Sequence, residues 1–380
     1  MADVRPFPGL RYTSAAGDIS ALVAPPYDVI PDEEVERWRQ ASPNNVSRFT
    51  KPGSDYAGAA AQLSRWLDDG VLAEDPPSMY VYEVRFDGRR RLDLLAALRL
   101  QPYEDRVVLP HERTHRGPKE DRLALMRAGG VAPEPLWFLY DSEGTGLPEL
   151  LEAATRAEPA AEFDFQGGHH RLWRIDEPTP LAAMTKALST QPVLIADGHH
   201  RYETTLAFSE EIGGTEDAAS RFTPALLSAL SDPGVEVLPT HRVLTTGVRV
   251  TGGEPAESLA EVLHRIDGQV AAGHYDGERF QVLPFDGDLA LVELHRQVID
   301  NILGSKPAEG NLLYTRDAEE AVRWVDDGRG VAAFFLPAPD LRQVLALARQ
   351  GMTLPQKSTY FYPKPPSGMV LHRLDPKRQL

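Results

Sequence analysis

The stretch from Val193 to Phe208 constrains the fold of this chain more than any other part of its sequence. Residues 193–196 form a short apolar run, which is typical of a buried strand. From Tyr202 onward, apolar residues recur at a helical spacing. Only the polar residues 197–201, Asp-Gly-His-His-Arg, separate the two patterns. The sequence therefore predicts a buried strand that passes through a tight polar turn directly into a helix.

The chemistry of this turn favours an anion site. Gly198 can adopt a backbone conformation that other residues resist, and it lets a ligand approach the main chain closely. The helix that follows begins with unpaired N–H groups and the positive end of its dipole, which suit a phosphate. Arg201 adds a permanent charge and a fork of donors. We therefore interpret Gly198, His199, His200 and Arg201 as ligands of a phosphate, that of a nucleotide.

Two other interpretations of the turn stay open. The two histidines and Arg201 could form a hydrogen-bonded helix cap that binds no ligand. A metal site at His199 and His200 is the weaker alternative. Adjacent residues on a helix point in different directions, whereas helical metal pairs sit about three or four residues apart.

The composition indicates a soluble protein that handles small molecules. The chain has 380 residues, 42% of them hydrophobic, which is enough for about two domains. With 40 basic and 56 acidic residues, the formal net charge is −16, which argues against affinity for a nucleic-acid backbone. The absence of cysteine excludes disulfides and thiol catalysis. Without a signal peptide or an apolar run that could span a membrane, we expect a cytoplasmic protein with neither nucleic acid nor membrane as partner.

A second dense polar stretch runs from Leu109 to Arg122 and leads into an expected helix over about 118–128. A solvated loop is the simplest interpretation of such a charge cluster. Its acidic and basic groups are, however, interleaved with His and Thr ahead of a helix N-terminus, which favours a second anion site. On that interpretation His111 or Glu112 is a general base. The phosphate-facing residues are then Arg113, Thr114, Lys119 and Arg122.

Two proline-braced segments are candidates for a substrate pocket. Pro25-Pro26 presents Tyr27 and Asp28, an aromatic ring and a carboxylate, on a stiff support, although such a segment can also be a rigid loop without function. Near the C-terminus, donors and aromatic rings crowd an extended path that is too aromatic for a disordered tail. We expect this tail to fold back and line the same cleft. Its predicted substrate-binding residues are Lys357, Ser358, Thr359 and Tyr360.

Helices and strands alternate through the first half of the chain, which predicts a mixed α/β (α+β) layer structure. The clearest signals are a helix over 56–67, a β-hairpin over 79–86 and 91–100, a buried strand over 136–140, and helices over 178–188 and 255–266. Gly213-Gly214-Thr215 predicts a surface linker. We therefore expect a nucleotide-binding domain over 1–215 and a C-terminal α/β region over 216–380, whose tail packs back on the active cleft.

Five motifs, in this order, resemble one family over nearly the whole chain. They are Pro25–Ile30, then His111–Thr114 with Lys119, Asp121 and Arg122, then Ala196–Thr204, then Asp232–Gly234 with Pro239–Arg242, and finally Pro355–Phe361. The family they resemble is the prokaryotic domain-of-unknown-function family ten-fifteen.

The turn at 197–201 is more distantly similar to the signature turn of the ParB/sulfiredoxin-like superfamily, and most of all to that of free-serine kinases. This resemblance implies a ParB/sulfiredoxin-like nucleotide-binding core in which residues 198–201 hold phosphates, with ATP or ADP and Mg²⁺ as cofactor. It also implies an acid early in the chain that activates a substrate hydroxyl, for which Asp28 and Glu112 are candidates. Sulfiredoxin's catalytic cysteine is absent, so its chemistry is excluded.

The leading hypothesis is a nucleotide-dependent phosphotransferase, a kinase whose acceptor is a small hydroxylated metabolite, with free L-serine as the best candidate. One alternative is a non-catalytic module that senses a nucleotide and controls a partner. Another is a phosphate-ester hydrolase that uses the same anion pocket. Asp197, Asp28 or Glu112 could hold the metal or accept the substrate proton.

Overall fold

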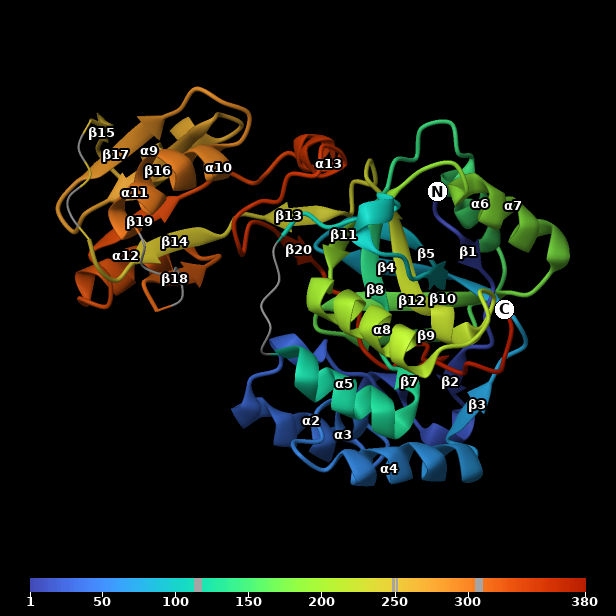
Figure 1. Cartoon of the computed structure of the whole chain (residues 1–380). Coiled ribbons are helices and arrows are strands. Elements are labelled where there is room, and N and C mark those ends of the chain that lie inside the picture. The colour runs from blue at the N-terminus through green and yellow to red at the C-terminus, as the bar shows by residue number, and fades with distance from the viewer. Residues whose placement is uncertain (113–117, 248–249, 251, 305–309) are drawn as a thin grey trace. The chain divides into compact units, whose positions relative to one another are not determined.

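The computed structural model of the chain describes residues 1–112, 118–247, 250, 252–304 and 310–380 (Figure 1). The chain divides into two compact units. Unit 1 comprises Met1–Pro110, Thr114–Val235 and Pro363–Leu380, and unit 2 comprises His111–Arg113 and Glu236–Tyr362.

Unit 1 is built on a large mixed sheet. Its strands run in the order β6, β11, β8, β12, β5, β4, β10, β9, and β1 pairs with β5. Their bounds are β1 (Val4–Arg5), β4 (Met79–Phe86), β5 (Arg89–Arg99), β6 (Val108–Leu109), β8 (Leu136–Tyr140), β9 (Ala161–Phe165), β10 (Gly168–Ile175), β11 (Val193–Asp197) and β12 (Phe222–Ala229). Two short pairs flank it: β2 (Leu10–Tyr12) with β3 (Leu72–Glu74), and β7 (Val131–Ala132) with β21 (His372–Arg373).

The helices of unit 1 pack partly on this sheet and partly on one another. They are α1 (Ile19–Leu22), α2 (Val35–Ala41), α3 (Ser47–Thr50), α4 (Tyr56–Asp68), α5 (Pro118–Gly129), α6 (Leu147–Ala154), α7 (Pro178–Leu188) and α8 (His199–Ile212). Helix α4 forms where Asp55 caps the N–H of Gly58, and it buries Ala59, Leu63 and Trp66 on one face. Helix α5 packs against α4 and α8 (Figure 1).

The middle of the sheet carries the main core of unit 1. Every residue of β8 and of β12 is buried, which explains why these strands read as continuous apolar runs rather than as alternating patterns. Trp137 and Phe138 of β8 are completely buried, and the indole N–H of Trp137 donates a hydrogen bond to Ser228 of β12 at 2.7 Å. This rigid centre fixes the strand ends on which the candidate site is built.

Unit 2 has its own sheet, in the order β15, β17, β16, β19, β14, β18. Its strands are β13 (Glu236–Leu238), β14 (His241–Leu244), β15 (Glu254–Ala256), β16 (Ala271–Tyr275), β17 (Phe280–Pro284), β18 (Leu312–Thr315), β19 (Ala332–Phe335) and β20 (Tyr360–Tyr362), and β13 pairs separately with β20. Its helices are α9 (Leu259–Ile266), α10 (Ala290–Leu294), α11 (Asp300–Leu303), α12 (Ala318–Asp326) and α13 (Leu341–Arg349).

Two apolar clusters make the core of unit 2. One contains Val262 of α9 and Val325 of α12, and the other contains Leu294 of α10 and Leu303 of α11. Between α10 and α11 the chain continues as a π-helical turn over His295–Ile299. Unit 2 is thus a second α/β layer structure with a separate core.

The structure confirms the expected mixed α/β class, and the predicted hairpin is present as antiparallel β4 and β5. The segment expected to be one helix over 255–266 instead begins as strand β15, and α9 starts only after Ser258, which caps the N–H of Glu261. The division of the chain also differs from the expected boundary at 215. Because β12 lies between β8 and β5 in the sheet, unit 1 continues to Val235, and it takes back the chain at Pro363.

Candidate functional site

The predicted turn lies where β11 ends. Strand β11 runs parallel to β6 but antiparallel to β8, with Asp197 opposite Trp137 and an irregularity in register after Ile195. The last residue of β11 therefore lies beside the segment that leads into β8. This register, and not proximity in sequence, brings Asp197 close to Glu134.

Gly198 has a backbone that favours glycine and no room for a side chain. Its φ is 99°, and it is the N-cap of α8. A Cβ at this position would lie 3.0 Å from Cδ2 of Leu136 and 3.2 Å from Cζ and Nε of Arg201. The space next to Gly198 is therefore filled from inside the protein. Gly198 therefore does not leave this space open for a ligand, because Leu136 and Arg201 occupy it.

Arg201 is held by carboxylates. Its side chain is only 6% exposed. Nη2 donates to Oδ2 of Asp197 at 2.5 Å, and Nη1 lies 3.3 Å from Oε2 of Glu134. Burial works against the charged guanidinium, but the carboxylates of Asp28, Glu134 and Asp197 outweigh it and raise the pKa of Arg201. Arg201 thus positions two carboxylates at the start of α8.

Asp197 receives a second cation from the tail of the chain. The Nζ of Lys364 donates a hydrogen bond to Oδ1 of Asp197, and each side chain is 14% exposed. Burial opposes ionisation of Asp197, yet the charges of Lys364 and Arg201 lower the pKa of its carboxyl to about 2. Asp197 is therefore ionised at neutral pH and shared between two cations.

Glu134 is a member of this cluster that the sequence analysis missed. Its side chain is 4% exposed, and its Oε1 accepts hydrogen bonds from the N–H of Tyr27 at 3.1 Å and from Oγ of Ser367 at 2.8 Å. Burial raises the pKa of Glu134, while the charge of Arg201 acts in the opposite direction. The available signal was a Glu between two prolines, immediately before a strand that contains no carboxylate.

Asp28 is the exposed carboxylate of the cluster. It lies in the 3₁₀-helix Tyr27–Val29, which follows two prolines, and its charge acts on Arg201, Glu134 and Lys364. The guanidinium of Arg122 from α5 stacks 4.0 Å above the ring of Tyr27. Arg122 also donates to the carbonyl of Thr50 at 2.6 Å. The predicted residues Tyr27, Asp28 and Arg122 are thus placed with the turn in unit 1.

The histidines of the turn lie in the first turn of α8. His199 is buried and His200 is half-buried. Behind the turn, Tyr27, Arg122, Glu134 and Arg201 line a cavity of about 20 Å³. A space of this size suits a single water molecule and excludes a nucleotide.

The remaining predicted residues belong to unit 2, or fall outside the described part of the chain. Nε2 of His111 lies 2.7 Å from Oγ1 of Thr359, and Oε1 of Glu112 accepts the N–H groups of Ser358 at 2.7 Å and of Thr359 at 3.2 Å. Lys357 has a φ of 57°, and the guanidinium of Arg316 lies 4.0 Å above the ring of Tyr360. His111 and Glu112 thereby fix the segment that carries Ser358 and Thr359. Arg113 and Thr114, with the side chain of Lys119, lie outside the described residues.

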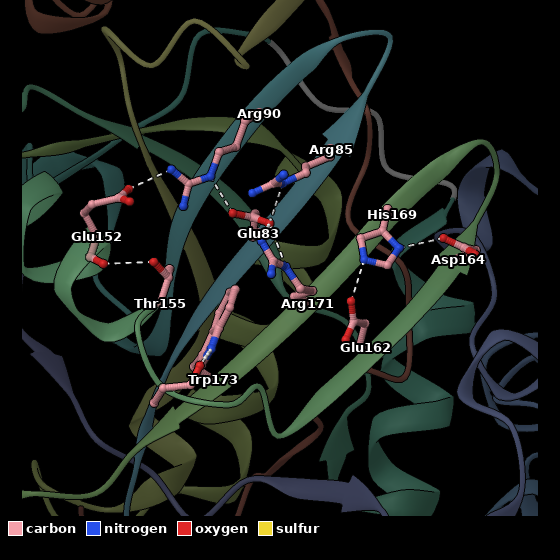
Figure 2. A network of polar contacts seen from close by, with 11 residues as sticks. Glu83, Arg85, Arg90, Glu152, Thr155, Glu162, Asp164, His169, Arg171 and Trp173 are labelled. Atoms are coloured by element: carbon pink, nitrogen blue, oxygen red, sulfur yellow. Dashed lines mark hydrogen bonds and ion pairs between the residues drawn. The ribbon is translucent and has the colours of Figure 1, made fainter.

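A larger hollow in unit 1 is lined by side chains of both charges. It measures about 620 Å³ and lies at the ends of the β4–β5 and β9–β10 hairpins, where Arg85, Arg90 and His169 are among the lining residues. Figure 2 shows the fully buried Glu83 surrounded by the guanidinium groups of Arg85, Arg90 and Arg171.

In the same network His169 lies between two carboxylates, 2.7 Å from Glu162 and 2.8 Å from Asp164 (Figure 2). Arg85, Arg90 and His169 each already have a carboxylate partner, so this hollow is a poorer candidate for an anion than the turn at 197–201. Within the described residues, no group of three or more His, Cys, Asp or Glu side chains is arranged to hold a metal ion.

Comparison with protein families identifies the chain. Residues 4–329 match the model of the family described as "Protein of unknown function (DUF1015)". The chain therefore belongs to the DUF1015 family, as its five motifs indicated. No curated protein matches the sequence.

Several solved structures have a similar arrangement at low identity. Free serine kinase in complex with AMP is 16% identical with a TM-score of 0.40, and the match covers 71% of this chain and 86% of that one. A conserved hypothetical protein from Pyrococcus furiosus is 17% identical with a TM-score of 0.40, covering 74% and 95%. SbnI from Staphylococcus aureus with a C-terminal truncation is 12% identical with a TM-score of 0.35, covering 70% and 82%. Among the helices of the described residues, none is long and apolar enough to cross a membrane.

Proposed function

We propose that this protein is a nucleotide-dependent phosphotransferase whose acceptor is a small hydroxylated metabolite, with free L-serine as the preferred substrate. The observation that carries the proposal is the charge cluster of unit 1, in which the exposed carboxylate of Asp28 acts electrostatically on Arg201 and Lys364, the two cations paired with Asp197. Phosphoryl transfer depends mainly on positioning and on neutralising charge, and this cluster offers fixed charges of both signs.

Asp28 is assigned the role of general base. Asp197 and Glu134 are buried and their oxygens accept hydrogen bonds from cations or from neighbouring donors. Asp28 is exposed, and no hydrogen bond or ion pair to its carboxylate is found in the part of the chain that the structure describes. An accessible carboxylate can accept the proton of a substrate hydroxyl as that oxygen attacks phosphorus.

The phosphate is assigned to the start of α8. The N–H groups of the first turn of a helix have no intrahelical partners, and the helix dipole favours negative charge there. In this assignment His199 and His200 flank the phosphate. Arg201 is a positioning residue, because its guanidinium is engaged by Asp197 and Glu134.

A divalent cation fits the exposed side of the cluster better than its buried side. Mg²⁺ prefers carboxylate and phosphate oxygens and retains several waters, and Asp28 is the accessible carboxylate near the proposed phosphate. When bound with the nucleotide, Mg²⁺ would neutralise charge on the phosphates. We propose ATP or ADP as the nucleotide.

The test separates binding from chemistry. Nucleotide binding to the full chain is measured by calorimetry with ATP and ADP in the presence of Mg²⁺, and transfer is measured as phosphoserine formed from L-serine. We expect Asp28→Asn to bind nucleotide without Mg²⁺ as the native protein does and to lose transfer by about a hundredfold or more. Asp87→Asn is the matched control, because Asp87 is an exposed residue at a hairpin tip with a φ of 46°, which Asn tolerates.

The outcomes also distinguish the other hypotheses. Nucleotide binding without transfer to any hydroxylated acceptor would favour a nucleotide-sensing module. Release of phosphate from phosphoserine without nucleotide would favour a hydrolase. If neither ATP nor ADP binds, the phosphotransferase proposal is wrong.

A further inference from the structure

Unit 2 contains a cavity of about 190 Å³ that the proposed function does not use. The residues that line it include Thr240, Arg242, Asp288, Asp340 and Ser358. They come from the start of β14, the segments before α10 and α13, and the segment before β20. The cavity belongs wholly to unit 2.

Arg242 lies in strand β14, and it is completely buried. Its guanidinium donates to the backbone carbonyls of Thr240, of Gln356 at 3.2 Å and of Lys357 at 3.1 Å. The Nε of Arg242 is buried and has no hydrogen-bond partner. Among the described residues, no carboxylate forms an ion pair with it. A buried guanidinium that is bound only by neutral groups is costly, and an anion would lower that cost.

The side chains around Arg242 do not supply that anion. Burial together with the charge of Arg242 lowers the pKa of His241 to about 4 and that of His295 to about 3, so both rings are neutral at physiological pH. Glu112 acts on Arg242 electrostatically, but its Oε1 accepts the N–H groups of Ser358 and Thr359. Of the guanidinium's nitrogens, Nε therefore still lacks an acceptor at the cavity wall.

The rest of the lining restricts the class of anion. Asp288 and Asp340 also line the cavity, and both are exposed residues. Two carboxylates disfavour a dianion such as phosphate and favour a ligand that carries a cation at the end away from the guanidinium. A guanidinium binds a carboxylate through two parallel hydrogen bonds.

We propose that this cavity of unit 2 binds a small amino acid, with its carboxylate at Arg242 and its ammonium group towards Asp288 and Asp340. The size of the cavity fits a small ligand, since the pockets that take drug-sized ligands measure about 300–1,000 Å³. This proposal does not depend on the proposed phosphotransferase activity of unit 1. It assigns unit 2 a binding role of its own.

The experiment uses L-alanine as probe, because it has no hydroxyl group and cannot accept a phosphoryl group. Binding to the full chain is measured by calorimetry and compared with acetate and inorganic phosphate. We expect L-alanine to bind at least about tenfold more tightly than either, a difference of about 1.4 kcal/mol. Tighter binding of phosphate, equal binding of acetate, or no binding of L-alanine would overturn the proposal.

Substitutions locate the binding in unit 2. We expect Asp288→Asn to weaken L-alanine binding about tenfold, while Asp286→Asn, an equal charge change at an exposed neighbour that does not line the cavity, leaves it unchanged. Arg242→Lys keeps the charge and removes the fork, so binding should also fall. If that variant fails to fold, the pair Asp288→Asn and Asp286→Asn still decides the question.

Asp28→Asn separates the two proposals. It should leave L-alanine binding unchanged whether or not unit 1 transfers phosphoryl groups. Loss of L-alanine binding in Asp28→Asn, with retention in Asp288→Asn, would place the amino acid in unit 1 and contradict the proposal.

Discussion

The Nζ of Lys364 donates a hydrogen bond to Oδ1 of Asp197, although the two residues are 167 positions apart in the chain. The other oxygen of Asp197 accepts from Arg201 at 2.5 Å. One carboxylate at the end of β11 thus joins the first turn of α8 to the segment that follows unit 2. The conformation of the turn therefore depends on a residue outside the turn.

Removing Lys364 should change how stability depends on pH. The pKa of Asp197 is lowered from 3.8 to about 2 in the folded protein. A carboxyl shifted downward stabilises the fold above its unfolded pKa, by about 2 kcal/mol here, and this contribution is lost as the pH falls through 4 towards 2. In Lys364→Met the shift should shrink, so the free energy of unfolding should fall less on acidification than in the native protein. Urea unfolding at neutral pH and at about pH 3 measures the difference, and equal pH dependence would contradict the role of Lys364.

Arg201→Met should destabilise unit 1 strongly, because it leaves Asp197 and Glu134 without their shared cation. Breaking a buried ion pair by removing one partner costs about 3–5 kcal/mol. Arg65→Ala on the exposed face of α4 is the control and should cost less than about 0.5 kcal/mol. Chemical denaturation measures both. A stable Arg201→Met variant that has lost nucleotide binding would instead restore Arg201 as the phosphate ligand predicted from the sequence.

Two N-cap glycines in the left-handed conformation offer a comparison of strain with packing. Gly198 caps α8 with φ 99° and ψ 29°, and Gly146 caps α6 with φ 66° and ψ 5°, but a Cβ at Gly146 would meet nothing within 4 Å. Gly146→Ala should therefore cost about 1–2 kcal/mol, from the backbone alone. Gly198→Ala should cost more, since its Cβ also presses on Leu136 and Arg201. Thermal unfolding ranks the variants, and equal losses would show that the turn adjusts.

Glu134→Gln removes the charge of this side chain but keeps its shape, whereas Glu134→Ala removes both. The amide oxygen of Gln can still accept the hydrogen bonds that Tyr27 and Ser367 donate to Oε1 of Glu134. The Ala variant leaves the N–H of Tyr27 unpaired, at about 1–3 kcal/mol, whereas the hydroxyl of Ser367 keeps the carbonyl of Pro25 as an acceptor at 3.2 Å. We expect Gln to retain more stability than Ala in urea unfolding. A more stable Ala variant would show that the buried carboxylate is a net cost to the fold.

Much of the fold could be predicted from the sequence because its signals are local. The apolar run of β8, the alternating hairpin of β4 and β5, and the strand–turn–helix of β11 and α8 all depend on residues close together in the chain. The expected boundary at residue 215 followed two glycines, but the pairing of β12 with β5 and β8 is a long-range contact that no local pattern indicates.

The candidate site was predicted only in part, for the same reason. Residues 197–201 were selected correctly as a turn, but the direction of the Arg201 guanidinium depends on Glu134, which arrives through the register of β8 against β11. Lys364 meets Asp197 only when the tail returns to unit 1. A buried arginine and an arginine that faces a ligand look the same in a sequence.

The return of the chain to unit 1 after unit 2 has a consequence for synthesis on the ribosome. Strand β11 and helix α8 emerge long before Pro363–Leu380, the last segment of unit 1. Until that segment leaves the exit tunnel, Asp197 lacks Lys364 and Glu134 lacks Ser367. The charge cluster can therefore reach its final form only after Lys364 and Ser367 have been added, so termination before them would leave the ionic centre of unit 1 incomplete.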